Sequence, residues 1–110
     1  MKRLRFTAEA SAEFLAEVAY YNEATAGLGD RFIEAVEEAS ALALSFPLAG
    51  SPYVANTRRV FTKGFPFSII YRPEDEGVVV FAITHNARKP DYWRSRVQNA
   101  QAAYGSDDLP

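Results

Sequence analysis

The stretch FSIIYRPEDEGVVVFAIT, residues 67–84, decides the fold of this chain. It contains two runs, Phe67–Arg72 and Val78–Thr84, that are rich in the β-branched and aromatic residues favoured in strands. The polar segment Glu74–Gly77 between them has the composition of a hairpin turn. The stretch therefore predicts two neighbouring antiparallel strands.

Two helices are predicted before this hairpin, because apolar residues recur there at spacings of three and four. The first helix begins after Thr7, an expected N-cap, and ends before Gly27. The second begins at Asp30, the other expected N-cap, and ends at Pro47. One short turn joins them, so they form a helical hairpin whose acidic residues face solvent. The expected apolar stripe of the first helix is Phe14, Leu15, Val18 and either Tyr21 or Asn22, with Glu13 among the solvent-facing glutamates.

Three further elements complete the predicted order. Residues 2–6 and 57–63 have strand-like patterns, and residues 91–104 form a final helix after a proline. The glycine and prolines of residues 48–56 predict a loop. The fold class is therefore α+β, with an N-terminal helical hairpin packed on a three- to four-stranded, mostly antiparallel sheet in the order β-α-α-β-β-β-α.

The composition indicates one soluble, cytoplasmic domain. The chain has 110 residues, 48% of them hydrophobic, which suits a single domain over residues 1–104 and a flexible tail at 105–110. No apolar run approaches the roughly 20 residues that span a bilayer, so no membrane contact is expected. A single histidine and no cysteine argue against a metal site. The glycines at 27 and 29 do not form a phosphate-binding loop, so no cofactor is expected.

The segment THNARKPDYWRSR, residues 84–96, collects the rarest side chains of the chain. It contains the only histidine, His85, and the only tryptophan, Trp93. Residues 57–96 hold eight basic and four acidic residues in a chain whose net charge is −2. This half could present a basic face to an anionic partner, or it could carry ordinary solvated charge on strand edges. The basic residues of the segment are Arg88, Lys89, Arg94 and Arg96.

Each candidate residue has a structural and a functional interpretation. His85 could act as a general base or make a local hydrogen bond. Arg88 lies in a predicted turn, where its guanidinium could bind a phosphate or carboxylate, or could tie the loop to an acidic residue of a helix. Tyr92 and Trp93 could pin the final helix to the sheet or contact a partner. Arg58–Arg59 opens a strand, so the two side chains should point to opposite faces of the sheet.

Four segments resemble the RelE/ParE superfamily of bacterial type II toxins. They are GLGDRFIEAVEEA, the isolated proline of SFPLAG, RRVFTKGFPFSIIYR and VVVFAITHNARKPDYWRSR, which cover nearly the whole chain in the family's order. The ending HNARKPDYWRSR resembles the ParE branch in particular. The resemblance implies two helices against an antiparallel sheet, and a growth-arresting toxin that a cognate antitoxin neutralises. It further implies a toxin–antitoxin hetero-oligomer that contacts DNA only through the antitoxin.

Two toxic mechanisms occur in this superfamily. ParE-like members poison DNA gyrase, whereas RelE-like members cut mRNA on the ribosome with basic residues and neither metal nor cofactor. Arg59 and Arg88 match two cation positions of the cutting members, but Phe61 and Ser68 occupy two others. We therefore expect gyrase poisoning, with mRNA cleavage as the alternative. A third interpretation is a non-toxic co-repressor that only binds its antitoxin.

The resemblance and the basic patch together define the expected site. For the cutting alternative, the candidate catalytic residues are His85 and Arg88, and Tyr92 or Trp93 falls near the family's tyrosine position. A surplus of apolar residues on the two helices, Phe46 among them, suggests that an antitoxin helix or strand covers part of the core. The expected partner-binding residues are Arg58, Arg59, Arg88, Tyr92, Trp93, Arg94 and Arg96.

Overall fold

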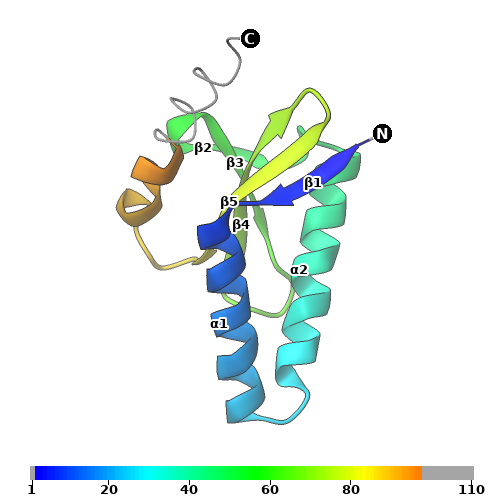
Figure 1. Ribbon diagram of the computed structural model, residues 1–110, viewed down its shortest axis with the longest axis vertical. Coiled ribbons are helices and arrows are strands. Elements are labelled where there is room, and N and C mark those ends of the chain that lie inside the picture. Colours follow the sequence, from blue (N-terminus) through cyan, green and yellow to red (C-terminus); the bar gives the residue numbers. More distant parts are fainter. Residues whose placement is uncertain (1, 98–110) are drawn as a thin grey trace.

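A computed structural model, which describes residues 2–97, places a helical hairpin against a five-stranded sheet (Figure 1). The elements are β1 (Arg3–Phe6), α1 (Ala8–Ala24), α2 (Leu28–Ser45), β2 (Ser51–Tyr53), a 3₁₀ turn (Val54–Asn56), β3 (Thr57–Phe61), β4 (Phe67–Glu74) and β5 (Gly77–His85). Residues 91–97 are helical. The rest of the predicted final helix and the predicted tail lie outside the described residues. The α+β class is confirmed, with one more strand than expected, because β2 lies in the predicted loop.

The sheet order is β1-β5-β4-β3-β2, and β1 alone runs parallel to its neighbour. The first strand returns to pair with the last, with Arg3 opposite Gly77 and Phe6 opposite Val80. Gly77 has a φ of 148°, and a Cβ at this position would overlap the carbonyl oxygen of Arg3. Only glycine lets β1 approach β5 this closely while the β4–β5 turn closes beside it.

A β-bulge sorts the side chains of β5 between two faces of the sheet. Ile70 lies opposite Ala82 and Tyr71 lies opposite Val80, so Phe81 is the additional residue. Tyr71 and Val80 pack in a cluster with α1 and α2, whereas Ile70, Phe81 and Ala82 pack in a second cluster. We call these the helical face and the second face; residues 53–55 and the 91–97 helix cover the second face.

The two long helices follow the predicted hairpin, with local differences. The Thr7 hydroxyl accepts a hydrogen bond from the Ala10 N–H at 3.1 Å, which confirms the first N-cap. The predicted cap at Asp30 is wrong, because α2 begins two residues earlier, after Gly27 with its φ of 85°. Gly29 lies inside α2, and its lack of a side chain lets α2 pack closely against Asn22 of α1. The Asn22 side chain accepts a hydrogen bond from the Gly29 N–H at 2.8 Å.

The apolar pattern is confirmed in most positions. Phe14, Val18 and Tyr21 pack against the core, but Leu15 is 63% exposed and does not belong to the stripe. Phe46 is also exposed, because it follows the end of α2 rather than lying on its buried side.

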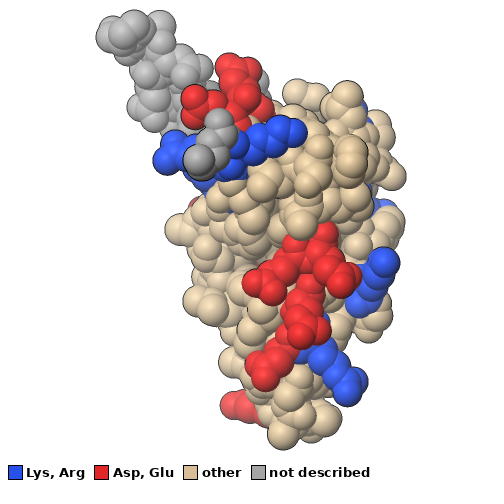
Figure 2. Space-filling view, turned by 90° about the vertical axis from the view of Figure 1, so that its right-hand side faces the viewer, with Lys and Arg blue, Asp and Glu red and all other residues tan. Residues whose placement is uncertain are grey.

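Figure 2 shows a column of acidic side chains along α2. The exposed acidic residues of this helix are Asp30, Glu34, Glu37 and Glu38. Their spacing places them on one side of the helix, away from the buried Phe32 and Val36. This confirms the predicted solvated side of α2. No helix within residues 2–97 has the length and apolar character to cross a membrane.

Candidate functional site

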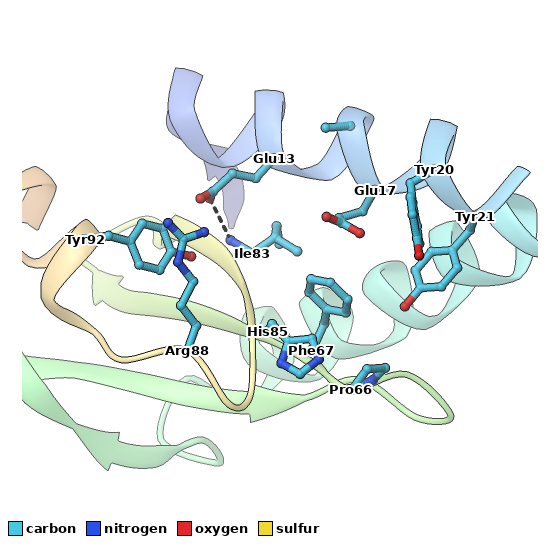
Figure 3. A pocket seen from close by; sticks show the side chains of 11 residues that line it. Glu13, Glu17, Tyr20, Tyr21, Pro66, Phe67, Ile83, His85, Arg88 and Tyr92 are labelled. Atoms are coloured by element: carbon cyan, nitrogen blue, oxygen red, sulfur yellow. Dashed lines mark hydrogen bonds between the residues drawn. The ribbon is translucent and has the colours of Figure 1, made fainter. Parts of the chain in front are cut away.

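A cleft of about 550 Å³ opens between α1 and the ends of β4 and β5 (Figure 3). It brings together three of the predicted site residues, His85, Arg88 and Tyr92. Within residues 2–97, no group of three or more histidine, aspartate or glutamate side chains is arranged to hold a metal ion. The cleft is lined by Glu13, Ala16, Glu17, Tyr20, Tyr21, Pro66, Phe67, Ile83, His85, Arg88 and Tyr92.

His85 uses its imidazole to hold the turn that follows β5. Its Nδ1 atom accepts a hydrogen bond from the Ala87 N–H at 3.1 Å, and its ring packs edge-on against Phe67 with a centroid distance of 5.3 Å. In the neutral ring the proton is therefore on Nε2, and the one basic lone pair is occupied. His85 therefore makes the local hydrogen bond that its structural interpretation predicted.

Arg88 and Arg96 both contact the ring of Tyr92. The guanidinium carbon of Arg88 lies 3.5 Å from the ring centroid, and that of Arg96 lies 5.1 Å from it. Such contacts are attractive because the ring face carries partial negative charge. Burial raises the pKa of Tyr92, although a hydrogen bond to Thr84 acts in the opposite direction. Tyr92 is therefore a protonated, half-buried support for Arg88. The ring holds Arg88 in place of the acidic helix residue that one of its two interpretations suggested.

Glu13 joins α1 to the last helix and to the sheet. Its carboxylate accepts two hydrogen bonds from Arg96, at 3.0 and 3.1 Å, and one from the Ile83 N–H at 3.2 Å. The predicted position on the solvent side is wrong, because β1 stops opposite Val80 and leaves the Ile83 N–H without a neighbouring strand. Glu13 fills that place, and a bidentate ion pair with Arg96 compensates its charge.

Trp93 packs inside the protein. Its side chain is 0% exposed and contacts Tyr53 at a centroid distance of 6.0 Å, within the cluster on the second face. The interpretation that it pins the last helix to the sheet is confirmed. Its predicted place among the partner-binding residues is wrong, because the buried indole is not accessible to a partner. Arg94, one position further, is exposed.

Arg58 and Arg59 lie on β3, two strands away from β5. Arg58 is opposite Tyr71 on the helical face and donates to the carbonyl oxygens of Gly50 and Leu48, at 2.7 and 3.1 Å. Arg59 lies on the second face, where its guanidinium stacks on Tyr53 at 4.5 Å. The prediction of opposite faces is confirmed, and these two arginines do not line the cleft that contains Arg88.

The chain is similar to known proteins in both sequence and fold. A family profile described as the ParE toxin of the type II toxin–antitoxin system, parDE, matches residues 4–90. The chain belongs to the ParE toxin family. The fold of this ParE-family toxin is similar to a chain of the chromosomal ParDE toxin–antitoxin system from P. aeruginosa, with a TM-score of 0.67 and 20% identity over 77% of this chain and 96% of that chain. No curated protein matches the sequence significantly. The resemblance to the ParE branch is confirmed.

The positions that a cutting relative would fill with cations lie on a different face of this ParE-family toxin from His85. Phe61 pairs with Ser68, and both side chains belong to the second face. Ser68 is fully buried, and its hydroxyl donates to the Asn86 side chain. His85 pairs with Phe67, on the helical face. His85 and Arg88 share the cleft, whereas the sheet separates His85 from the two positions that are uncharged in this chain.

The wall of the cleft that α1 forms was not predicted from the sequence. α1 supplies it with Glu17, Tyr20 and Tyr21 in addition to Glu13. These positions recur at spacings of three and four, which is the signal for one side of a helix. The glutamates were expected to face solvent, so no sequence pattern indicated that this side of α1 covers the ends of β4 and β5. The ParE-family toxin thus has an aromatic and acidic wall facing Arg88.

Proposed function

We propose that this type II toxin arrests growth by poisoning DNA gyrase in the cytoplasm. The observation that supports this choice over mRNA cleavage is that Phe61 and Ser68, which occupy two positions where a cutting relative has cations, lie on the opposite face of the sheet from His85. Cleavage needs a base, an acid and charge stabilisation held around one phosphate. His85 has its lone pair occupied, and Phe61 and Ser68 carry no charge. Losing one well-placed stabiliser typically costs about 10²–10³ in rate, so losing two leaves little activity.

Binding gyrase requires an interface rather than a catalytic constellation. Arg88 is exposed, and Tyr92 supports it beside a cleft that Tyr20 also lines. Tyrosine and arginine are among the residues that dominate binding energy at protein interfaces. The exposed loop after β5 is also presented by a rigid sheet, which suits a recognition surface.

Two assays test the gyrase proposal. We expect the purified toxin to inhibit supercoiling and to trap cleaved DNA, while primer extension on mRNA from a translating extract finds no new ends. Arg88→Ala should weaken the gyrase effect at least about tenfold, as expected for a central interface arginine. The matched control is Lys89→Ala, which removes an adjacent exposed cation that does not line the cleft. Codon-phased mRNA cleavage with supercoiling untouched would reverse the choice.

The co-repressor interpretation has a different outcome. A chain that only binds antitoxin would leave growth unchanged when it is expressed alone and recovered folded. Expression without the antitoxin therefore separates a toxin from a co-repressor before any target is tested.

We also propose that a cognate antitoxin neutralises this protein by covering the exposed edge of β1. An apolar groove of about 350 Å³ lies between this strand and the two long helices, lined by Leu4, Phe6, Phe14, Ile33, Val36, Glu37, Ser40, Ala41 and Leu44. Leu4 is 40% exposed, and the buried hydroxyl of Ser40 has no hydrogen-bond partner among residues 2–97. An added strand or amphipathic helix would cover the apolar side chains and could bond to this hydroxyl. Any contact with DNA would then come through the antitoxin.

The antitoxin proposal is tested by binding to the product of the adjacent gene. We expect binding at micromolar concentration or tighter, and we expect Leu4→Asp to weaken it about tenfold or more, because a buried leucine contributes roughly 1.5–3 kcal/mol. Leu15→Asp is the matched control, since Leu15 is exposed on α1 and does not line the groove. Absence of binding at micromolar concentration would refute the partner, and equal effects of the two variants would refute the location.

A further inference from the structure

The cleft has two chemically different ends (Figure 3). At one end Arg88 reaches towards Tyr92 and Glu13. At the other, Glu17 extends from α1 above Phe67, with Tyr20 and Tyr21 beside it; we call this the tyrosine end. The proposed function uses Arg88 and Tyr92 at the first end and mentions Tyr20 only as a lining residue, so it assigns no role to Glu17.

Glu17 is a carboxylate without a counter-charge in the described part of the chain. It is half-buried, and neither an ion pair nor a hydrogen bond involves its side chain within residues 2–97. Its neighbour Glu13 differs, since Arg96 compensates that charge. Burial raises the pKa of the Tyr21 hydroxyl, and the negative charge of Glu17 raises it further. The cleft therefore holds one negative charge that the protein leaves open to a ligand.

Aromatic rings surround this carboxylate. Tyr20 and Tyr21 meet at a centroid distance of 5.5 Å, Tyr21 and Phe67 at 6.3 Å, and Phe67 and His85 at 5.3 Å. Tyr20 is 63% exposed, so its ring is accessible to a ligand entering from solvent. Ring faces attract organic cations, and a carboxylate among them adds a direct ion pair. A wall of rings around one carboxylate is thus suited to an ammonium or guanidinium group.

Arg88 also lines the cleft, but its positive charge does not remove the preference of the tyrosine end for a cation. Arg88 is held against Tyr92 at 3.5 Å, and Figure 3 shows it directed away from Tyr20 and Tyr21. A phosphate or carboxylate at the tyrosine end would meet the charge of Glu17 in a partly desolvated site, which disfavours it. The volume of about 550 Å³ leaves room for a long side chain with its apolar stem along the rings.

We infer that the tyrosine end of the cleft is a subsite for a lysine or arginine side chain of a protein partner. Glu17 pairs with the cationic head, and the rings of Tyr20, Tyr21 and Phe67 hold the stem. The identity of the partner as a toxin target rests on the proposed function, whereas the cation preference of the subsite does not.

The test uses three small probes and the whole protein. N-acetyl-L-arginine amide and N-acetyl-L-lysine amide present the two cationic heads, and N-acetyl-L-norleucine amide presents a neutral stem. We expect at least one basic amide to shift the NMR signals of Tyr20, Tyr21 and His85 in a saturable way at millimolar concentration, with no saturation by the norleucine amide. Glu17→Gln should weaken the basic probe at least about fivefold, as expected for loss of an ion pair in a partly desolvated site. The matched control is Glu23→Gln, an exposed α1 residue that does not line the cleft.

The outcomes separate this inference from the proposed function. Saturable binding of a basic amide that depends on Glu17 supports the subsite, even if the toxin then leaves gyrase untouched and the proposed target fails. Equal binding of the norleucine amide, equal binding by Glu17→Gln, or no response to either basic amide overturns the subsite whatever the gyrase assays find.

Discussion

Replacing Trp93 with alanine is expected to destabilise the protein by about 3–5 kcal/mol, the usual cost of truncating a buried tryptophan. Its indole is fully buried against Tyr53 and joins residues 91–97 to the second face. Loss of the ring leaves a cavity and frees the helix that carries Tyr92 and Arg96. For a domain of this size, the melting temperature should fall by more than about 10 °C, which a thermal unfolding curve measures.

Arg88→Ala is the control for this loss. Arg88 is exposed and stacks on one ring, so its removal should cost only about 0.5–1 kcal/mol. We expect this variant to melt close to the unaltered protein and to lose growth arrest. A fall in melting temperature as large as that of Trp93→Ala would make Arg88 a structural residue and remove it from the proposed interface.

Gly77→Ala is expected to separate β1 from the sheet. The φ of 148° alone costs a side chain about 1–3 kcal/mol, and the new Cβ would also overlap the backbone of Arg3. The cheapest relief is displacement of the short edge strand, which pairs with β5 over four residues. Hydrogen exchange should therefore lose protection at the amides of β1, and the melting temperature should fall as well.

Gly64→Ala isolates the backbone contribution to that effect. Gly64 has a φ of 80°, but a Cβ there would meet no atom within 4 Å. Its substitution should cost only the conformational strain and leave β1 protected. Equal destabilisation by the two variants, with β1 protected in both, would show that the approach of Arg3 does not matter.

The parts of the fold that were predictable are those set by local pattern. The β4–β5 hairpin, the helical hairpin, the cap at Thr7 and the opposite directions of Arg58 and Arg59 follow from periodicity and residue type over a few positions. The start of α2 was misjudged because Gly29 acts through contact with Asn22 of another helix, which no local pattern records. β2 was missed because Ser51–Tyr53, three residues with a proline at the centre, form a strand only through pairing with the edge of β3.

The same distinction applies to the candidate site. His85, Arg88 and Tyr92 could be found because they lie at or just after the end of a strand, in a segment of unusual composition. Glu13 and Glu17 could not, because their roles depend on where β1 stops and on which side of α1 covers the sheet. Trp93 was assigned both a structural and a partner-binding interpretation, and only its burial distinguishes them.

The parallel pairing of β1 with β5 also affects the order in which the protein can mature. Arg3 of β1 lies opposite Gly77 of β5. β1 is therefore synthesised before the other strands of the sheet but can pair only after β5 has been made. The helical hairpin can form from local contacts during synthesis, whereas β1 stays open with Leu4 and Phe6 uncovered. A nascent chain therefore lacks a complete sheet until β5 has been synthesised, and the loop after β5 is not yet available to any partner that would recognise it. That interval gives a co-expressed partner time to bind before the mature surface exists.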